Sequence, residues 1–277
     1  IFKFFSSIKF SENLINKCKP DIIALSHQHS YQCTPLAWIG AKKGIPVIIC
    51  HGDFGVPRFY RISRPEDIYH GIGHPPKKNM LNLDPKKIIK LKSIGEEYLS
   101  KRISGFSRDI GGRYAFQKGK NKLVLDQDKK DKKVISIYLA NWFDWPHIYG
   151  MSRYMDIIDW IKVTIQKASN NKNVIWLLRP HPMESWFGGV SIKELFKNKL
   201  PPNVILLDPE YSGNSVIEIS DALVTLHGTA AIEFASLGKP VLVADKGWYH
   251  DCGFVKFPKS KEEYFKFLEG DWYKSIK

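Results

Sequence analysis

Membrane-spanning segments and paired cysteines are both missing from this sequence. It has no apolar run of about eighteen residues, the length that crosses a bilayer as a helix. Its four cysteines are scattered, with no C-x-x-C pair and no spacing typical of metal ligands. Scattered thiols in a chain of 277 residues indicate a reducing compartment. We therefore expect a cytoplasmic protein with ordinary buried cysteines.

Acidic residues are in deficit, with 28 Asp and Glu against 42 Lys and Arg, a net charge of +14. A nucleic-acid binder would need a basic patch laced with aromatics or a recognised module, and neither is present. No nucleic-acid partner is therefore expected. Two explanations stay open: a lysine bias that keeps the protein soluble, or attraction to an anionic membrane surface. The second would place the protein peripherally at the inner face of the plasma membrane, with basic residues clustered around 85–101.

The beginning of the sequence gives no sign of a targeting segment. Residues 1–10 are apolar but interrupted by Lys3 and Lys9, and no small-residue cleavage site follows. We interpret this stretch as the tail of a preceding element rather than a signal peptide. The first domain is then short and has no obvious opening strand.

Short apolar runs alternate with amphipathic stretches along the chain, the rhythm of βαβ units around a parallel sheet. The predicted strands are 21–26, 46–50, 134–140, 174–178, 204–207, 222–226 and 240–244. The predicted helices and helical turns are 34–43, 85–101, 154–168, 191–199, 215–220, 229–237 and 262–268. The fold class expected is α/β, with two Rossmann-like domains and a central cleft between them.

A polar stretch separates the two series of elements. Residues 117–133 contain seven lysines and three aspartates, too much charge for a buried core. We expect an N-terminal domain over 1–120, a linker over 121–133 and a C-terminal domain over 134–277. A long surface loop within one domain is the alternative.

The most informative segment runs from Asp221 to Asp245, where a strand ends in a tight turn and a helix begins at once. Ligands of open α/β sheets bind at the carboxyl ends of strands. Gly228 lets the backbone approach a phosphate, and the Thr229 hydroxyl can cap the helix or donate to that phosphate. Glu233 lies one turn later and can accept hydrogen bonds from ribose hydroxyls. A plain turn with a threonine cap and a solvated glutamate is the alternative.

The run HGTAAIEFASLGKPVLVAD, followed by Gly-Trp-Tyr and Gly-Phe, resembles the C-terminal domain of GT-B glycosyltransferases. It is similar, more narrowly, to the capsule polysaccharide biosynthesis proteins that include Kdo transferases. The segment Arg179-Pro180-His181-Pro182 is similar to that family's K/R-P-H-P after a strand. The resemblance covers residues 134–254 well and the first half only in outline.

This resemblance implies roles for particular residues. Glu233 would hold the donor ribose, and His227, Gly228 and Thr229 would face the donor phosphate. Arg179 and His181 would line the same cleft, although a histidine that only caps a strand end is the alternative for His181. No D-x-D motif stands where a metal-dependent transferase would use one, so we expect neither metal nor cofactor.

In the first half, the segment His51-Gly52-Asp53 follows a predicted strand. An inverting transferase needs a base for the acceptor hydroxyl, and a carboxylate or histidine serves. We rank Asp53 first, His51 second and Asp144 third, with a structural turn as the alternative for Asp53. His27-Gln28-His29 also follows a strand, but no further ligand nearby supports a metal site.

These observations predict a metal-independent glycosyltransferase that uses a nucleotide sugar, CMP- or UDP-linked, to build a capsule or lipopolysaccharide. Its acceptor would be a lipid-linked or growing glycan. A non-hydrolysing UDP-sugar 2-epimerase shares the expected fold. A non-catalytic sugar-nucleotide-binding or polysaccharide-export protein is the third possibility.

Overall fold

The computed structural model describes residues 2–28, 32–51, 58–69, 82–107, 110–117, 122–125, 131–141, 149–187, 190–197 and 199–274. The chain forms two compact units. The N-terminal unit comprises Ile1–His74 and Trp145–Met151, and the C-terminal unit comprises Pro75–Asp144 and Ser152–Lys277. None of the described helices is long and apolar enough to cross a membrane.

The N-terminal unit is a small α/β layer. Its elements are α1 (Phe2–Cys18), β1 (Ile23–Leu25), α2 (Cys33–Lys42), β2 (Val47–His51), β3 (Arg58–Ile62) and the 3₁₀ helix η2 (Pro65–Tyr69). Strand β2 lies between β1, which is parallel to it, and β3, which is antiparallel. Val47, Ile49 and Ile62 are fully buried beneath α1 and α2. The unit is therefore a βαβ element with an added antiparallel strand.

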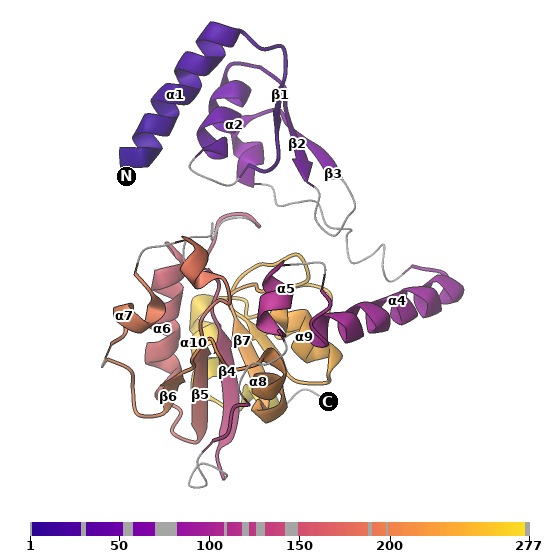
Figure 1. Cartoon of the computed structure of the whole chain (residues 1–277), viewed down its shortest axis with the longest axis vertical. Helices are drawn as coiled ribbons and strands as arrows, with labels where there is room; N and C mark the ends of the chain where they lie inside the picture. Colours follow the sequence, from indigo (N-terminus) through magenta and orange to yellow (C-terminus); the bar gives the residue numbers. More distant parts are fainter. Residues whose placement is uncertain are drawn as a thin grey trace. The chain divides into compact units, whose positions relative to one another are not determined.

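The C-terminal unit contains a five-stranded parallel sheet (Figure 1). Its elements are α4 (Pro85–Ile103), α5 (Ile110–Ala115), β4 (Lys133–Tyr138), α6 (Ile157–Ala168), β5 (Val174–Arg179), η4 (Glu184–Phe187), α7 (Ile192–Leu195), β6 (Val204–Leu206), α8 (Gly213–Ile219), β7 (Ala222–Thr225), α9 (Ala230–Ser236), β8 (Val241–Val243), α10 (Lys261–Glu269) and η5 (Trp272–Lys274). The strand order is β6-β5-β4-β7-β8. Because the chain reverses direction across the sheet at β4 and β7, their carboxyl ends form the switch point where such sheets bind ligands.

Helices cover both faces of this sheet. Ile135 and Ile137 of β4 face Trp160 of α6 and Tyr264 of α10, and all four side chains are buried. On the other face, α8 and α9 bury Val216 and Phe234 among separate apolar clusters. Helix α6 begins where the Asp156 side chain accepts a hydrogen bond of 2.7 Å from the Asp159 amide. The α/β class with two Rossmann-like units is confirmed.

The division of the chain differs from the one expected. Residues 75–144 belong to the C-terminal unit, so α4 and α5 pack with the second sheet rather than with the first. Leu123, within the expected linker region, is buried against Val134 and Leu177. The surrounding lysines obscure this short apolar segment, because composition averaged over the stretch does not show that Leu123 is buried.

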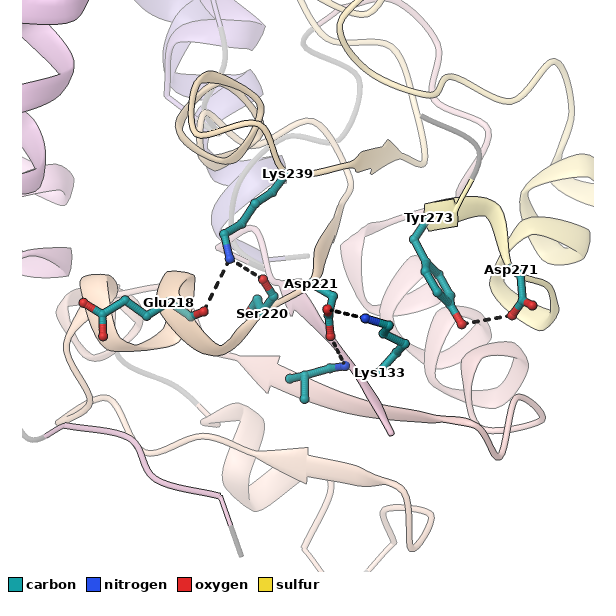
Figure 2. Close-up of polar contacts among 8 residues, drawn as sticks. Lys133, Glu218, Ser220, Asp221, Lys239, Asp271 and Tyr273 are labelled. Carbon is teal, nitrogen blue, oxygen red and sulfur yellow. Dashed lines mark hydrogen bonds and ion pairs between the residues drawn. The ribbon is translucent and has the colours of Figure 1, made fainter. Parts of the chain in front are cut away.

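The amino-terminal edge of the C-terminal sheet is held by its own polar contacts, shown in Figure 2. The Asp221 carboxylate accepts hydrogen bonds of 2.8 Å from Lys133 Nζ and from the Val134 amide. Lys239 Nζ donates to the carbonyl oxygens of Ser220 and Glu218, at 2.5 Å and 3.4 Å. Lys239 is the lysine of the G-K-P-V run, and it stabilises the end of α8 at the edge opposite the turn after β7.

Candidate functional site

The carboxyl ends of β4 and β7 carry the turn that the sequence singled out. Tyr138 ends β4, opposite Thr225 at the end of β7. Thr225 Oγ1 donates to the Tyr138 carbonyl at 3.1 Å and accepts from the Gly228 amide at 3.3 Å. A Cβ on Gly228 would lie 2.9 Å from Thr225 Oγ1. Glycine is therefore required here by close packing, and its φ is not in the left-handed region.

A tyrosine from the G-W-Y segment also holds this turn. Tyr249 is fully buried, and its hydroxyl donates to the Gly228 carbonyl at 2.6 Å. Thr229 precedes α9, yet its side chain makes no capping hydrogen bond and is exposed. The threonine cap considered from the sequence is therefore wrong, because Thr229 already has helical backbone angles, with φ −63° and ψ −19°.

Glu233 is neither solvated nor isolated. Its side chain is about 7% exposed and forms an ion pair with Arg102 Nε, a residue of α4 that is itself almost buried. The guanidinium also donates to Ser107 Oγ at 3.4 Å. A Cβ at Gly112 would lie 2.5 Å from Arg102 Nη1, so the α5 glycine leaves room for the guanidinium. The solvated glutamate considered from the sequence is wrong.

Arg179 approaches the same place from the end of β5. Its guanidinium lies over the Tyr138 ring, 5.2 Å from the centroid, and donates to the carbonyls of Tyr211 and Ser212 at 3.4 Å. Burial raises the pKa of Tyr138 to about 12, with the charge of Arg179 opposing this shift and that of Glu233 adding to it. Tyr138 is therefore close enough to both Arg179 and Glu233 for their charges to affect its pKa.

His227 is the first residue of the turn and lies within the field of the buried Asp245. Its Nε2 is inaccessible to solvent although the residue as a whole is only partly buried. Burial lowers the pKa of His227 to about 4 against the opposing charge of Asp245. The imidazole is therefore neutral at pH 7, and contact with a phosphate would use a hydrogen bond rather than charge.

Asp245 follows β8 and organises a neighbouring loop. Its carboxylate accepts hydrogen bonds from Ser152 Oγ, from the Arg153 amide at 2.9 Å and from the Lys246 amide at 2.8 Å. Only 3% of the residue is exposed. The sequence motif ended on this aspartate, but its spacing gave no indication that it binds residues 152 and 153.

His181 lies two residues beyond β5 and is partly buried. Its Nδ1 accepts a hydrogen bond of 3.2 Å from the Met183 amide, and its carbonyl accepts one of 3.0 Å from the Glu184 amide. An accepting Nδ1 places the proton of a neutral ring on Nε2. His181 therefore shapes the turn into η4.

A cavity of about 460 Å³ opens beside this region within the C-terminal unit. The α4–α5 connection, α5 and η4 form its walls. The lining residues are Ser104, Gly105, Phe106, Ile110, Arg113, Tyr114, Gln117 and Trp186. The rings of Tyr114 and Trp186 meet edge to face at 5.0 Å between centroids. Phe106 and Trp186 are more than half exposed, so two flat aromatic surfaces are accessible to a ligand.

The three candidate bases, Asp53, His51 and Asp144, are not placed by the structure. His51 is the last residue of β2, but its side chain, Asp53 and Asp144 lie outside the described residues, as does His29. Gln28, between the two histidines considered, is buried and its carbonyl accepts from Thr34 Oγ1 at 2.7 Å.

The prediction that the protein needs no metal is also untested. In the described part of the chain, no three His, Cys, Asp or Glu side chains gather as metal ligands would. The sequence does contain one D-x-D, Asp126-Gln127-Asp128, and it lies outside the described residues. The expected independence from metal therefore stays a prediction.

Comparison with known proteins decides the fold. No protein-family model matches the chain, and no curated protein matches its sequence. The chain is similar to the β-Kdo 2,4 transferase of KpsC from Thermosulfurimonas dismutans, with a TM-score of 0.54 and 15% identity over 86% of this chain and 73% of that one. The chain has a GT-B fold.

Two further structures show weaker likeness. The β-Kdo 2,7 transferase of KpsC from the same organism has a TM-score of 0.49 and 16% identity, over 91% of this chain and 73% of that one. A UDP-GlcNAc 2-epimerase from Methanocaldococcus jannaschii, in complex with UDP-GlcNAc and UDP, has a TM-score of 0.40 and 14% identity, over 97% and 74%. The fold therefore rests on the likeness to the 2,4 transferase, which at 15% identity shows the fold alone.

The sequence analysis missed three residues that shape the site at the carboxyl ends of β4 and β7. Arg102 lies on a helix that was assigned to the other domain, 131 residues from its partner Glu233. Tyr138 was part of a predicted strand, and Tyr249 was noted only as part of an aromatic segment. A tyrosine near the carboxyl end of a predicted apolar strand was the available signal for Tyr138.

Proposed function

We propose that this chain is a glycosyltransferase that transfers a sugar from a nucleotide donor to a growing surface glycan. The GT-B fold supports a nucleotide-sugar enzyme of this kind. The single observation that carries the proposal is the group of charges at the switch point of the C-terminal sheet. Arg102 and Arg179 provide two positive charges there, and Glu233 provides one negative charge.

The excess positive charge suits a phosphorylated donor. When the bond between the sugar carbon and the phosphate oxygen breaks, negative charge grows on the leaving phosphate. Preoriented guanidinium groups stabilise such charge because they need no reorganisation in the transition state. Arg179 is fixed by the Tyr211 and Ser212 carbonyls, and Arg102 by Glu233. Both groups therefore have fixed positions before a donor binds.

The turn after β7 would contact the same phosphate. Thr229 has an exposed side chain whose hydroxyl can donate. The neighbouring His227 ring is neutral, and its Nε2 is inaccessible to solvent. Glu233 has a second carboxylate oxygen beside the one that accepts from Arg102, and it would accept from the donor ribose. The aromatic cavity near Trp186 would take a planar ring of the nucleoside.

Transfer also requires a base. In an inverting reaction, the acceptor hydroxyl oxygen forms a bond to the sugar carbon while its proton passes to a carboxylate or imidazole. Asp53 is our first candidate, followed by His51 and Asp144. The acceptor would be a lipid-linked or growing glycan of a capsule or lipopolysaccharide.

A thermal-shift screen against CMP-, UDP- and GDP-sugars tests donor binding. A donor at about one hundred times its Kd stabilises the folded chain by about 2.7 kcal/mol, a Tm increase of roughly 5–10 °C. Thr229→Val should reduce that shift, whereas Lys239→Gln, a change at the opposite edge of the sheet, should preserve it. A uniform absence of shifts would refute the donor site.

The reaction class needs a second measurement. Incubation of the stabilising nucleotide sugar without acceptor should leave it unchanged, and a glycan acceptor should release the free nucleotide. Epimerisation of the nucleotide sugar in the absence of acceptor would identify a 2-epimerase instead. Binding without either reaction would identify a sugar-nucleotide-binding protein.

A further inference from the structure

Within the described part of the C-terminal unit, helix α4 has an apolar face that is uncovered along most of its length. Ile88, Leu91, Ile94 and Tyr98 recur at intervals of three and four residues, and each is between 42% and 52% exposed. Of its nineteen residues, only Arg102, near the carboxyl end, is buried. Figure 1 shows α4 running outward from the rest of the C-terminal unit. Most helical stability in proteins comes from packing of an amphipathic face, so this face of α4 is a candidate surface for a partner.

The charges on α4 indicate which kind of partner. Lys86, Lys87 and Lys90 are exposed in its first two turns, and the first turn contains no acidic residue. Positive charge at a helix amino terminus opposes the helix dipole and destabilises the helix. The acidic residues Glu96 and Glu97 come later and pair with Lys92 and Lys101 on the same helix. The early lysines are therefore placed against the preference of the helix itself, which an external anionic partner would explain.

We propose that α4 lies in the surface of an anionic lipid membrane and attaches the protein there. The apolar residues would enter the boundary between headgroups and acyl chains, and the amino-terminal lysines would contact anionic headgroups. Apolar burial and basic charge together give stable attachment where either alone is weak. This inference is independent of the proposed catalytic function, since lipid attachment can be measured without donor or acceptor.

Co-sedimentation of the full chain with sucrose-loaded vesicles tests the proposal. One set of vesicles is phosphatidylcholine alone, and the other contains about one quarter phosphatidylglycerol. Two α4 variants and two control variants from the same unit are compared. The apolar-face variant is Ile88→Gln, Leu91→Gln, Ile94→Gln, and its control is Met155→Gln, Val190→Gln, Leu237→Gln. The lysine variant is Lys86→Gln, Lys87→Gln, Lys90→Gln, and its control is Lys162→Gln, Lys193→Gln, Lys199→Gln.

The controls match the α4 variants in kind. Met155, Val190 and Leu237 are exposed apolar residues, and both lysine sets lower the formal charge from +14 by three. Glutamine has a helix propensity close to that of leucine and lysine, so both α4 variants should fold, as circular dichroism would verify.

We expect the unmodified chain to bind the anionic vesicles only. Each α4 variant should lower the partition coefficient about tenfold or more, and the controls should change it less than about threefold. Raising the salt from about 50 to about 500 mM should weaken binding steeply.

Three results would overturn the assignment. Absence of binding to anionic vesicles would refute membrane attachment. Equal losses in the two lysine variants, with no loss in the apolar-face variant, would indicate diffuse charge attraction without α4. A dimer in light scattering that only the apolar-face variant dissociates, with vesicle binding unchanged, would show that a second copy covers this face.

Discussion

The ion pair between Arg102 and Glu233 should be essential for stability because both side chains are almost buried. Arg102→Met removes the guanidinium and leaves the carboxylate in a site that water hardly reaches. Breaking a buried pair in this way costs about 3–5 kcal/mol, because the remaining charge has lost its counter-ion. That is a large part of the 5–15 kcal/mol of unfolding free energy typical of a folded chain.

The neighbouring residue on the same helix offers a matched control. Lys101 pairs with Glu97, and both side chains are more than 60% exposed. Because exposed pairs contribute little, Lys101→Met should change the unfolding free energy far less than Arg102→Met does. Urea unfolding followed by tryptophan fluorescence measures both variants, since Trp160 and Trp176 are buried in the C-terminal unit.

A double variant separates loss of the pair from loss of packing. Arg102→Met with Glu233→Met removes both charges and replaces them with apolar side chains, so it should be more stable than Arg102→Met alone. If Arg102→Met costs less than about 1 kcal/mol, or if the double variant is less stable than Arg102→Met alone, the pair does not stabilise the chain as we argue.

Three further predictions concern the turn after β7 and the base. Tyr249→Phe removes the hydrogen bond to the Gly228 carbonyl and should lower the unfolding free energy by about 0.5–1.5 kcal/mol, as measured by urea unfolding. An unchanged unfolding free energy would show that this hydrogen bond does not stabilise the turn. The pKa of His227 is about 4, below its ordinary value of 6.5, so the unfolded chain binds more protons between these pH values. Stability should therefore fall as pH drops from about 6.5 to about 4, and His227→Asn should reduce this slope in unfolding titrations; an unchanged slope would assign it to other groups. Asp53→Ala should lower turnover about 100-fold or more in a transferase assay and leave donor binding intact; normal turnover would move the base to His51 or Asp144.

Local pattern was sufficient for most of the secondary structure. The expected helix 85–101 is α4 (Pro85–Ile103), and the expected strand 174–178 is β5 (Val174–Arg179). Apolar spacing and stop signals such as Gly238 act over a few residues, so they can be read directly from the chain. The same reasoning missed β3 and α5. It also interpreted residues 1–10 as the tail of a preceding element, whereas they belong largely to α1 (Phe2–Cys18). Their apolar periodicity is short or mixed with charged residues.

The sequence by itself determined the α/β class and the turn at residues 227–229. Those features follow from strands that end in turns, which is local information. Only the tertiary structure decided that α4 packs with the second sheet, that Arg102 reaches Glu233 and that Tyr249 holds Gly228. Each of these contacts joins distant segments, and burial of a specific pair depends on how whole helices pack. No periodicity in one sequence contains that information.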